Sequence, residues 1–121
     1  MLILFSAVAA LIHVWIFLME SFLWGTPKIN KAFNMTPQQA EENKTFAFNQ
    51  GFYNLFLSIA IFSGIYFIYV GHESVGNTLV IYSCASMVGA SLVLLKSNKK
   101  LIRAALIQGL PPFLSVVSFF L

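Results

Sequence analysis

Four long stretches without a charged residue constrain this chain more than any other feature. Even the shortest, 18 residues rising 1.5 Å each as a helix, is close to the length that crosses about 30 Å of hydrocarbon. None alternates between polar and apolar residues, so helices are favoured over barrel strands. The stretches cover residues 1–19, 45–71, 74–95 and 104–121.

The composition excludes the alternatives to a membrane protein. Apolar residues make up 59% of the 121 positions and charged residues only 9%, too few for an ordinary soluble domain. An aromatic content of 16% also excludes a disordered chain. We therefore predict an all-α polytopic protein in contact with the lipid bilayer, a single four-helix transmembrane bundle over residues 1–121. Its expected helices are about 2–24, 37–71, 75–95 and 101–121.

The basic residues predict how the bundle is oriented. All seven Lys and Arg lie in the first and third connections, 25–44 and 96–103. The positive-inside rule places both connections in the cytoplasm and both termini outside it, in what we expect to be a bacterial inner membrane. The cluster from Lys96 to Arg103 is thus taken first as a topology signal, with an anionic-lipid site as the alternative. Because these charges form no stripe with exposed aromatics, no nucleic-acid partner is expected.

The first connection predicts local structure of its own. Thr36, Pro37 and Gln39 have the spacing of a capping box with proline at the first helical position. The second helix should therefore begin near Pro37 and run unbroken into the membrane. Residues 25–34 before it are expected to form a loop at the membrane surface.

Glu20 is the first candidate for function, because it is the single acid inside a predicted span. An ionisable residue at that depth needs a partner or a cavity. His13 lies seven residues earlier on nearly the same helical face, which Trp24 extends. Glu20 and His13 are a candidate proton-exchanging pair, although about 10 Å of helix rise would require a water or a third side chain between them.

Carboxamides of the other helices are the expected walls of this site. Their amides can both donate and accept hydrogen bonds, as a carboxyl or polar ligand requires. When depth is counted as helix rise from the lysine-rich ends, these residues and Glu20 all lie in the cytoplasmic half of the membrane. This predicts a polar pocket open to the cytoplasm. The candidates are Asn49, Gln50, Asn54 and Gln108, with Tyr53 in support. Hydrogen bonding that only fixes helix packing is the structural alternative for each, and for His13 it is the favoured one.

Small residues on the third helix suggest a second packing surface. Ala85 with Gly89, and Ser86 with Ala90, are spaced four apart, as in close helix contacts. Packing within the bundle is the simpler explanation, and a homodimer through this face is the alternative.

No metal or cofactor is expected. Cys84 is the single cysteine, so one chain can form neither a disulfide nor a cysteine zinc cluster. A haem or metal site would need histidine ligands shared between two chains.

Three strings of residues together resemble a family of small bacterial integral membrane proteins, the domain of unknown function 1304 family. The resemblance covers the whole chain and implies a compact four-helix membrane protein with these positions as its site, but no activity. The strings are His13 and Glu20 followed by Phe22-Leu23-Trp24 and Thr26-Pro27, then Asn49-Gln50-Gly51-Phe52-Tyr53-Asn54, and finally Gln108-Gly109-Leu110-Pro111.

Three functions remain open at this point. The first is binding or proton-coupled transport of a small amphipathic molecule at Glu20. The second is a membrane-embedded acid-base enzyme, of isomerase type, acting on a lipid or isoprenoid through Glu20 and His13. The third is a non-catalytic subunit of a membrane assembly, in which the polar residues only hold helices together.

Overall fold

The computed structural model describes all 121 residues, and every regular element in it is a helix. Four of the helices are long and apolar enough to cross a membrane, which confirms the predicted all-helical architecture with four candidate spans. The long helices are α1 (Leu2–Ser21), α4 (Lys44–Tyr69), α5 (Glu73–Ser97) and α6 (Ile102–Phe120). Between α1 and α4 lie α2 (Pro27–Ala32) and α3 (Pro37–Glu42), and one 3-10 turn, η1 (Lys99–Leu101), precedes α6.

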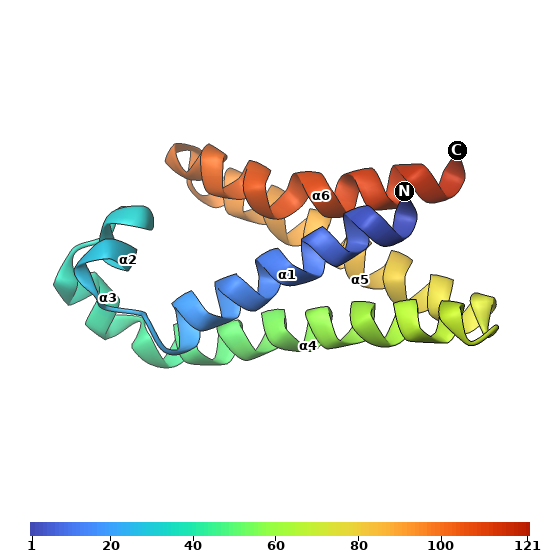
Figure 1. The fold of residues 1–121 in the computed structure, drawn as a ribbon. Helices are drawn as coiled ribbons and strands as arrows, with labels where there is room; N and C mark the ends of the chain where they lie inside the picture. Colours follow the sequence, from blue (N-terminus) through green and yellow to red (C-terminus); the bar gives the residue numbers. More distant parts are fainter.

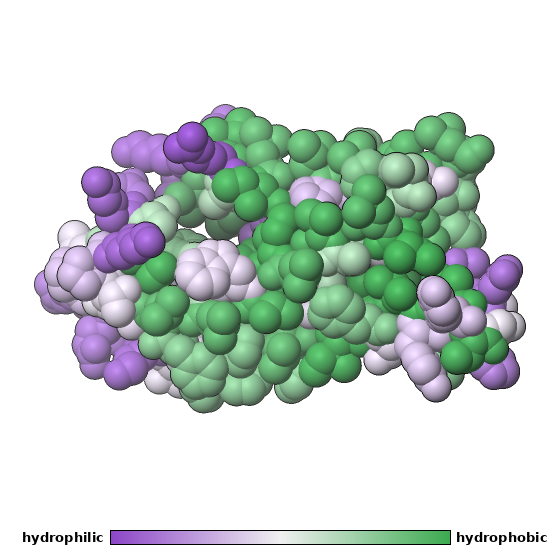
Figure 2. Space-filling model, viewed as in Figure 1, coloured by the Kyte–Doolittle hydropathy of each residue, from purple (hydrophilic) through white to green (hydrophobic).

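The long helices form a closed ring of four. α1 packs along α4 and α6, and α5 packs along the same two helices, whereas α1 and α5 barely touch across the diagonal. Figure 1 shows α1 crossing obliquely, from α6 near the chain termini to α4 at the opposite end. At that opposite end the α5–α6 pair stands apart from α1, and Figure 2 shows the surface hollowed there.

The two ends of the bundle differ in charge. Both termini and the α4–α5 connection lie at one end, while α2, α3 and the α5–α6 connection lie at the other (Figure 1). All seven Lys and Arg are therefore at the second end, where hydrophilic residues gather in Figure 2. The surface between the ends is mainly apolar, as expected of helices that face lipid.

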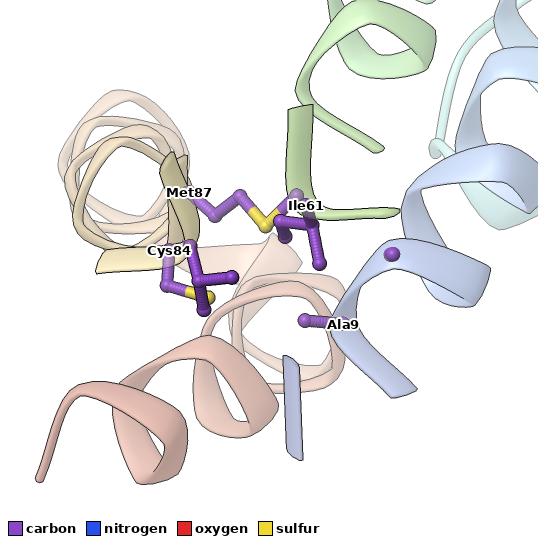
Figure 3. Packing of buried hydrophobic residues seen from close by; sticks show 6 residues of the cluster. Ala9, Ile61, Cys84 and Met87 are labelled. Carbon is purple, nitrogen blue, oxygen red and sulfur yellow. The ribbon is translucent and has the colours of Figure 1, made fainter. Parts of the chain in front are cut away.

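The buried core is small. It consists of Ala9, Ala10, Ile61, Val80, Cys84 and Met87, drawn from α1, α4 and α5. In Figure 3 the Met87 side chain reaches from α5 toward Ile61 of α4, beside Ala9 of α1. Large apolar residues such as Leu11, Phe56 and Leu106 instead lie more than half exposed, because in a membrane they are covered by lipid.

Glycines allow the helices to approach closely at three places. A Cβ at Gly51 would collide with Ser21 of α1, and a Cβ at Gly64 would lie 2.8 Å from the carbonyl oxygen of Gly76 in α5. At Gly109 of α6, a Cβ would lie 2.7 Å from Ser91 Cβ. Real Cβ atoms do not pack so closely, so these contacts require glycine.

The prediction of a single helix over 37–71 was wrong, because the helix is interrupted at Asn43. The capping box is confirmed: Thr36 Oγ1 accepts from the Gln39 N–H at 3.1 Å, and the Thr36 N–H donates to Gln39 Oε1 at 2.9 Å. Asn43 then donates from both its side chain and its backbone to the Gln39 carbonyl oxygen. The backbone bond has the ordinary spacing of a helix, whereas the side-chain bond is of the kind by which asparagine competes with it; Asn43, at φ −102° and ψ 6°, separates α3 from α4.

The other predicted boundaries shift by a few residues. α1 ends at Ser21 and not at 24, because the Leu23 N–H bonds back to the Leu18 carbonyl and Gly25 takes a positive φ of 89°. Residues 25–34, predicted as loop, contain α2, which begins at Pro27. α5 extends beyond 75–95 at both ends, and the predicted fourth helix is η1 followed by α6.

Candidate functional site

Glu20 forms a hydrogen bond across the α1–α4 interface. Asn54 Nδ2 in α4 donates to Glu20 Oε1, one residue before α1 ends. Glu20 remains part-exposed and forms no ion pair with a Lys, Arg or His of the chain. The carboxyl is thus held at one oxygen by an amide while its charge has no counterion within the protein.

Further hydrogen bonds join α1 and α4 on both sides of this pair. Ser21 Oγ donates to the Phe48 carbonyl oxygen at 2.9 Å, and the fully buried Ser58 Oγ donates to that of Ala10 at 2.8 Å. Sequence analysis missed both serines. The signal that could have found them is the enrichment of small hydroxyl residues at contacts between membrane helices.

His13 is buried but lies apart from the Glu20 pair. Its Nδ1 is 2.8 Å from the Ala9 carbonyl oxygen of the same helix, and the side chain is 1% exposed. A carbonyl only accepts, so Nδ1 carries the proton, and a neutral ring then offers Nε2 as an acceptor. No hydrogen bond connects His13 with Glu20, which lies about 10 Å further along the helix.

The other site residues predicted from the sequence do not form one enclosed pocket around Glu20. Asn49, Gln50 and Tyr53 are exposed on α4, so they do not wall an enclosed cavity. Gln108 is half-buried on α6, and its side chain forms no hydrogen bond to Glu20. Among the predicted carboxamides, only Asn54 forms a hydrogen bond with the acid.

Trp24 ties the end of α1 to the short helices. Its Nε1 donates to the Ala40 carbonyl oxygen of α3 at 2.8 Å, and its ring lies 5.3 Å from that of Phe33. Asn30 of α2 is buried and donates to the Gly25 carbonyl oxygen at 3.3 Å, while its Oδ1 has no partner. The segment from 24 to 42 is therefore attached to the bundle and not a free linker.

Aromatic rings of α1 and α4 pack together at the end of the bundle that holds Glu20. Phe17, one turn before Glu20, meets Phe22 and Phe52 edge to face, with ring centroids 5.4 and 5.0 Å apart. Phe48 lies 5.1 Å from Phe52 and extends the cluster. Such rings provide apolar surface and negative faces that attract cations.

The small residues predicted to form a packing surface on α5 lie mainly on its exposed side. Ala85, Gly89 and Ala90 are exposed and Ser86 is half-buried, on the side of α5 away from its buried residues. No atom lies within 4 Å of a Cβ built on Gly89. Most of this face therefore lies outside the packing of the bundle.

Chemically, the arrangement can accept hydrogen bonds or a proton at Glu20. No three His, Cys, Asp or Glu side chains lie close enough to hold a metal ion. A carboxyl held by an amide suits a small ligand with a hydrogen-bond-donating or cationic group.

Comparison with known proteins identifies a family for nearly the whole chain. No curated protein and no solved structure matches it significantly. Residues 7–120, however, match the family described as protein of unknown function (DUF1304), as the sequence resemblance predicted. The chain therefore belongs to the DUF1304 family.

Proposed function

We propose that this chain binds a small amphipathic molecule with a cationic or hydrogen-bond-donating head at Glu20, exchanging it for a proton. The binding site would lie at the lysine-rich end of the bundle. Glu20 would hold the head, and Asn54 would position the carboxyl by its hydrogen bond.

One observation carries this proposal: Glu20, the one acid of α1, pairs with an amide of α4 and with no cation. An isolated carboxylate in a membrane is unfavourable unless a proton or a cation compensates its charge. Since the chain supplies no such cation, a proton or a bound ligand must do so. Competition between the two for one carboxyl is the basis of proton-coupled exchange.

The surroundings of Glu20 support an amphipathic ligand. The aromatic cluster of Phe17, Phe22, Phe48 and Phe52 offers apolar surface along the same α1–α4 interface. Asn49, Gln50, Tyr53, Gln108 and His13 remain candidates for further contacts with the ligand. Trp24 is a supporting residue, because it attaches the segment that covers this end.

Orientation and assembly belong to the same proposal. We place the 25–44 and 96–103 connections in the cytoplasm of a bacterial inner membrane, so that the site opens inward. A homodimer through Ala85, Ser86, Gly89 and Ala90 would pair faces that the single chain leaves largely exposed.

Small molecules that copurify with the protein test this function. Wild type, Glu20→Gln and Glu41→Gln are purified in parallel from membranes and extracted for mass spectrometry, with empty membranes as a blank. Glu41 is an exposed acid of α3 and serves as the matched control. We expect one amphipathic species to be enriched in wild type and Glu41→Gln and to fall at least tenfold in Glu20→Gln, because the amide cannot carry the charge.

A species retained equally by Glu20→Gln would place the ligand elsewhere. The absence of any enriched species in correctly folded wild type would contradict the binding function and favour a structural role for the Glu20 and Asn54 pair.

A further inference from the structure

A membrane-facing groove runs between α5 and α6, away from Glu20. Its volume is about 220 Å³, and eight of its ten lining residues are hydrophobic. The floor is formed where the two helices touch, at Ser91, Ala105 and Gly109, all of them buried. Because these residues are small, the helices meet closely and leave a furrow between the larger side chains beside them.

The walls of the groove are large apolar side chains from both helices. Leu92 and Leu95 stand on the α5 side, and Leu106, Leu110 and Phe113 stand on the α6 side. Phe113 is the twelfth residue of α6, so the groove extends about 17 Å from the start of that helix. A groove of this length and polarity suits a hydrocarbon chain.

The mouth of the groove lies at the cationic connection between the two helices. Lys96 directly follows Leu95, and Arg103 directly follows Ile102, both groove residues. Lys96 also lies one turn after Leu92, on the same side of α5. Lys99 and Lys100 belong to η1, which joins α5 to α6, and all four cations are exposed.

We propose that this groove binds one anionic phospholipid, with an acyl chain along the furrow and the phosphate at Lys96, Lys99 and Arg103. The apolar walls alone would accept the chains of any lipid. Four cations with no acid between 96 and 103 select a negative headgroup, as basic pockets between membrane helices do. This site is separate from Glu20 and does not depend on the function proposed above.

Photocrosslinking in vesicles of equal phosphatidylcholine and phosphatidylglycerol tests the site on the full chain. The variant Phe113→p-benzoylphenylalanine reports on the groove, and Phe56→p-benzoylphenylalanine reports on ordinary lipid-facing surface. The two phenylalanines are matched, since they are 50% and 57% exposed and stand twelfth and thirteenth in their helices. Intact-mass spectrometry after irradiation gives the ratio of the two lipid adducts at each position.

We expect the ratio of phosphatidylglycerol to phosphatidylcholine adducts at position 113 to exceed that at position 56 at least fivefold. Combined Lys96→Gln, Lys99→Gln and Arg103→Gln should lower it to the ratio at position 56. Neutralising three cations at the same end, by Lys28→Gln, Lys31→Gln and Lys44→Gln, should leave it unchanged.

Salt provides a second measurement that does not depend on folding of the triple variants. In about 1 M salt the Debye length falls to roughly 3 Å, so the preference at position 113 should largely disappear. Equal ratios at positions 113 and 56 at low salt would overturn the proposal. So would a preference that survives both high salt and loss of the three groove cations.

Discussion

Asn54 Nδ2 donates to Glu20 Oε1 across the contact between α1 and α4, which links the single intramembrane acid to the second long helix. The next hydrogen bond of this interface starts at Ser58, one turn further along α4, which also bonds to the Asn54 carbonyl oxygen at 3.1 Å. The acid therefore takes part in helix packing as well as in the proposed ligand site.

Replacing Asn54 should measure the contribution of this hydrogen bond to stability. We expect Asn54→Ala to lower the free energy of unfolding by about 1 kcal/mol, as interhelical hydrogen bonds in membranes typically contribute. Asn49→Ala removes an exposed carboxamide of the same helix and should change stability by less than about 0.5 kcal/mol. Unfolding of both variants in mixed detergent micelles provides the comparison, and equal losses would show that the Glu20 contact contributes nothing.

Two glycines should respond to alanine in opposite ways. At Gly51 the added Cβ meets Ser21 and lies 3.0 Å from the Phe17 carbonyl oxygen, so α1 and α4 must separate. We expect Gly51→Ala to destabilise the bundle by about 1–3 kcal/mol. Gly89 is also helical but has open space around it, so Gly89→Ala should be neutral or stabilising by up to about 1 kcal/mol. Thermal unfolding in detergent distinguishes the two, and a costly Gly89→Ala would indicate a protein contact at that face.

The four spans and the capping box were predictable because each depends on local sequence. Charge-free stretches mark the helices, and Thr36 with Gln39 marks the start of α3. The break at Asn43 was not predictable from the proline and the hydrophobic pattern, since it depends on whether one asparagine bonds back to Gln39.

The Glu20 site was predictable in its chemistry but not in its geometry. Gln50 and Asn54 share a face by spacing, yet only Asn54 reaches the acid. The rotation of α4 about its axis decides this, and that rotation depends on packing such as the close approach of Gly51 to α1. In a membrane both the buried and the lipid-facing sides of a helix are apolar, so hydropathy does not mark the inner face. Small residues such as Ala9, Ala10 and Ser58 mark it instead.

The orientation proposed for the bundle predicts which connections are accessible from outside the cell. Single cysteines are introduced by His72→Cys, Gln38→Cys and Ser97→Cys, all at exposed positions. An impermeant maleimide added to intact cells should label only the His72→Cys chain, and the other two should react after permeabilisation. Cys84 is buried, so wild type is the blank. Labelling of the Gln38 and Ser97 variants in intact cells would reverse the orientation.

His13 should tolerate an apolar replacement of similar size if its role is packing. Its ring hydrogen-bonds only to the Ala9 carbonyl oxygen of its own helix, so His13→Leu leaves no partner on another helix unsatisfied. We expect it to change the free energy of unfolding by less than about 1.5 kcal/mol. His13→Ala should lose about 2–4 kcal/mol, because a fully buried side chain is replaced by a cavity. If His13→Leu instead folds normally but loses the ligand that wild type retains, the free Nε2 acts on that ligand, and His13 joins Glu20 in the binding site.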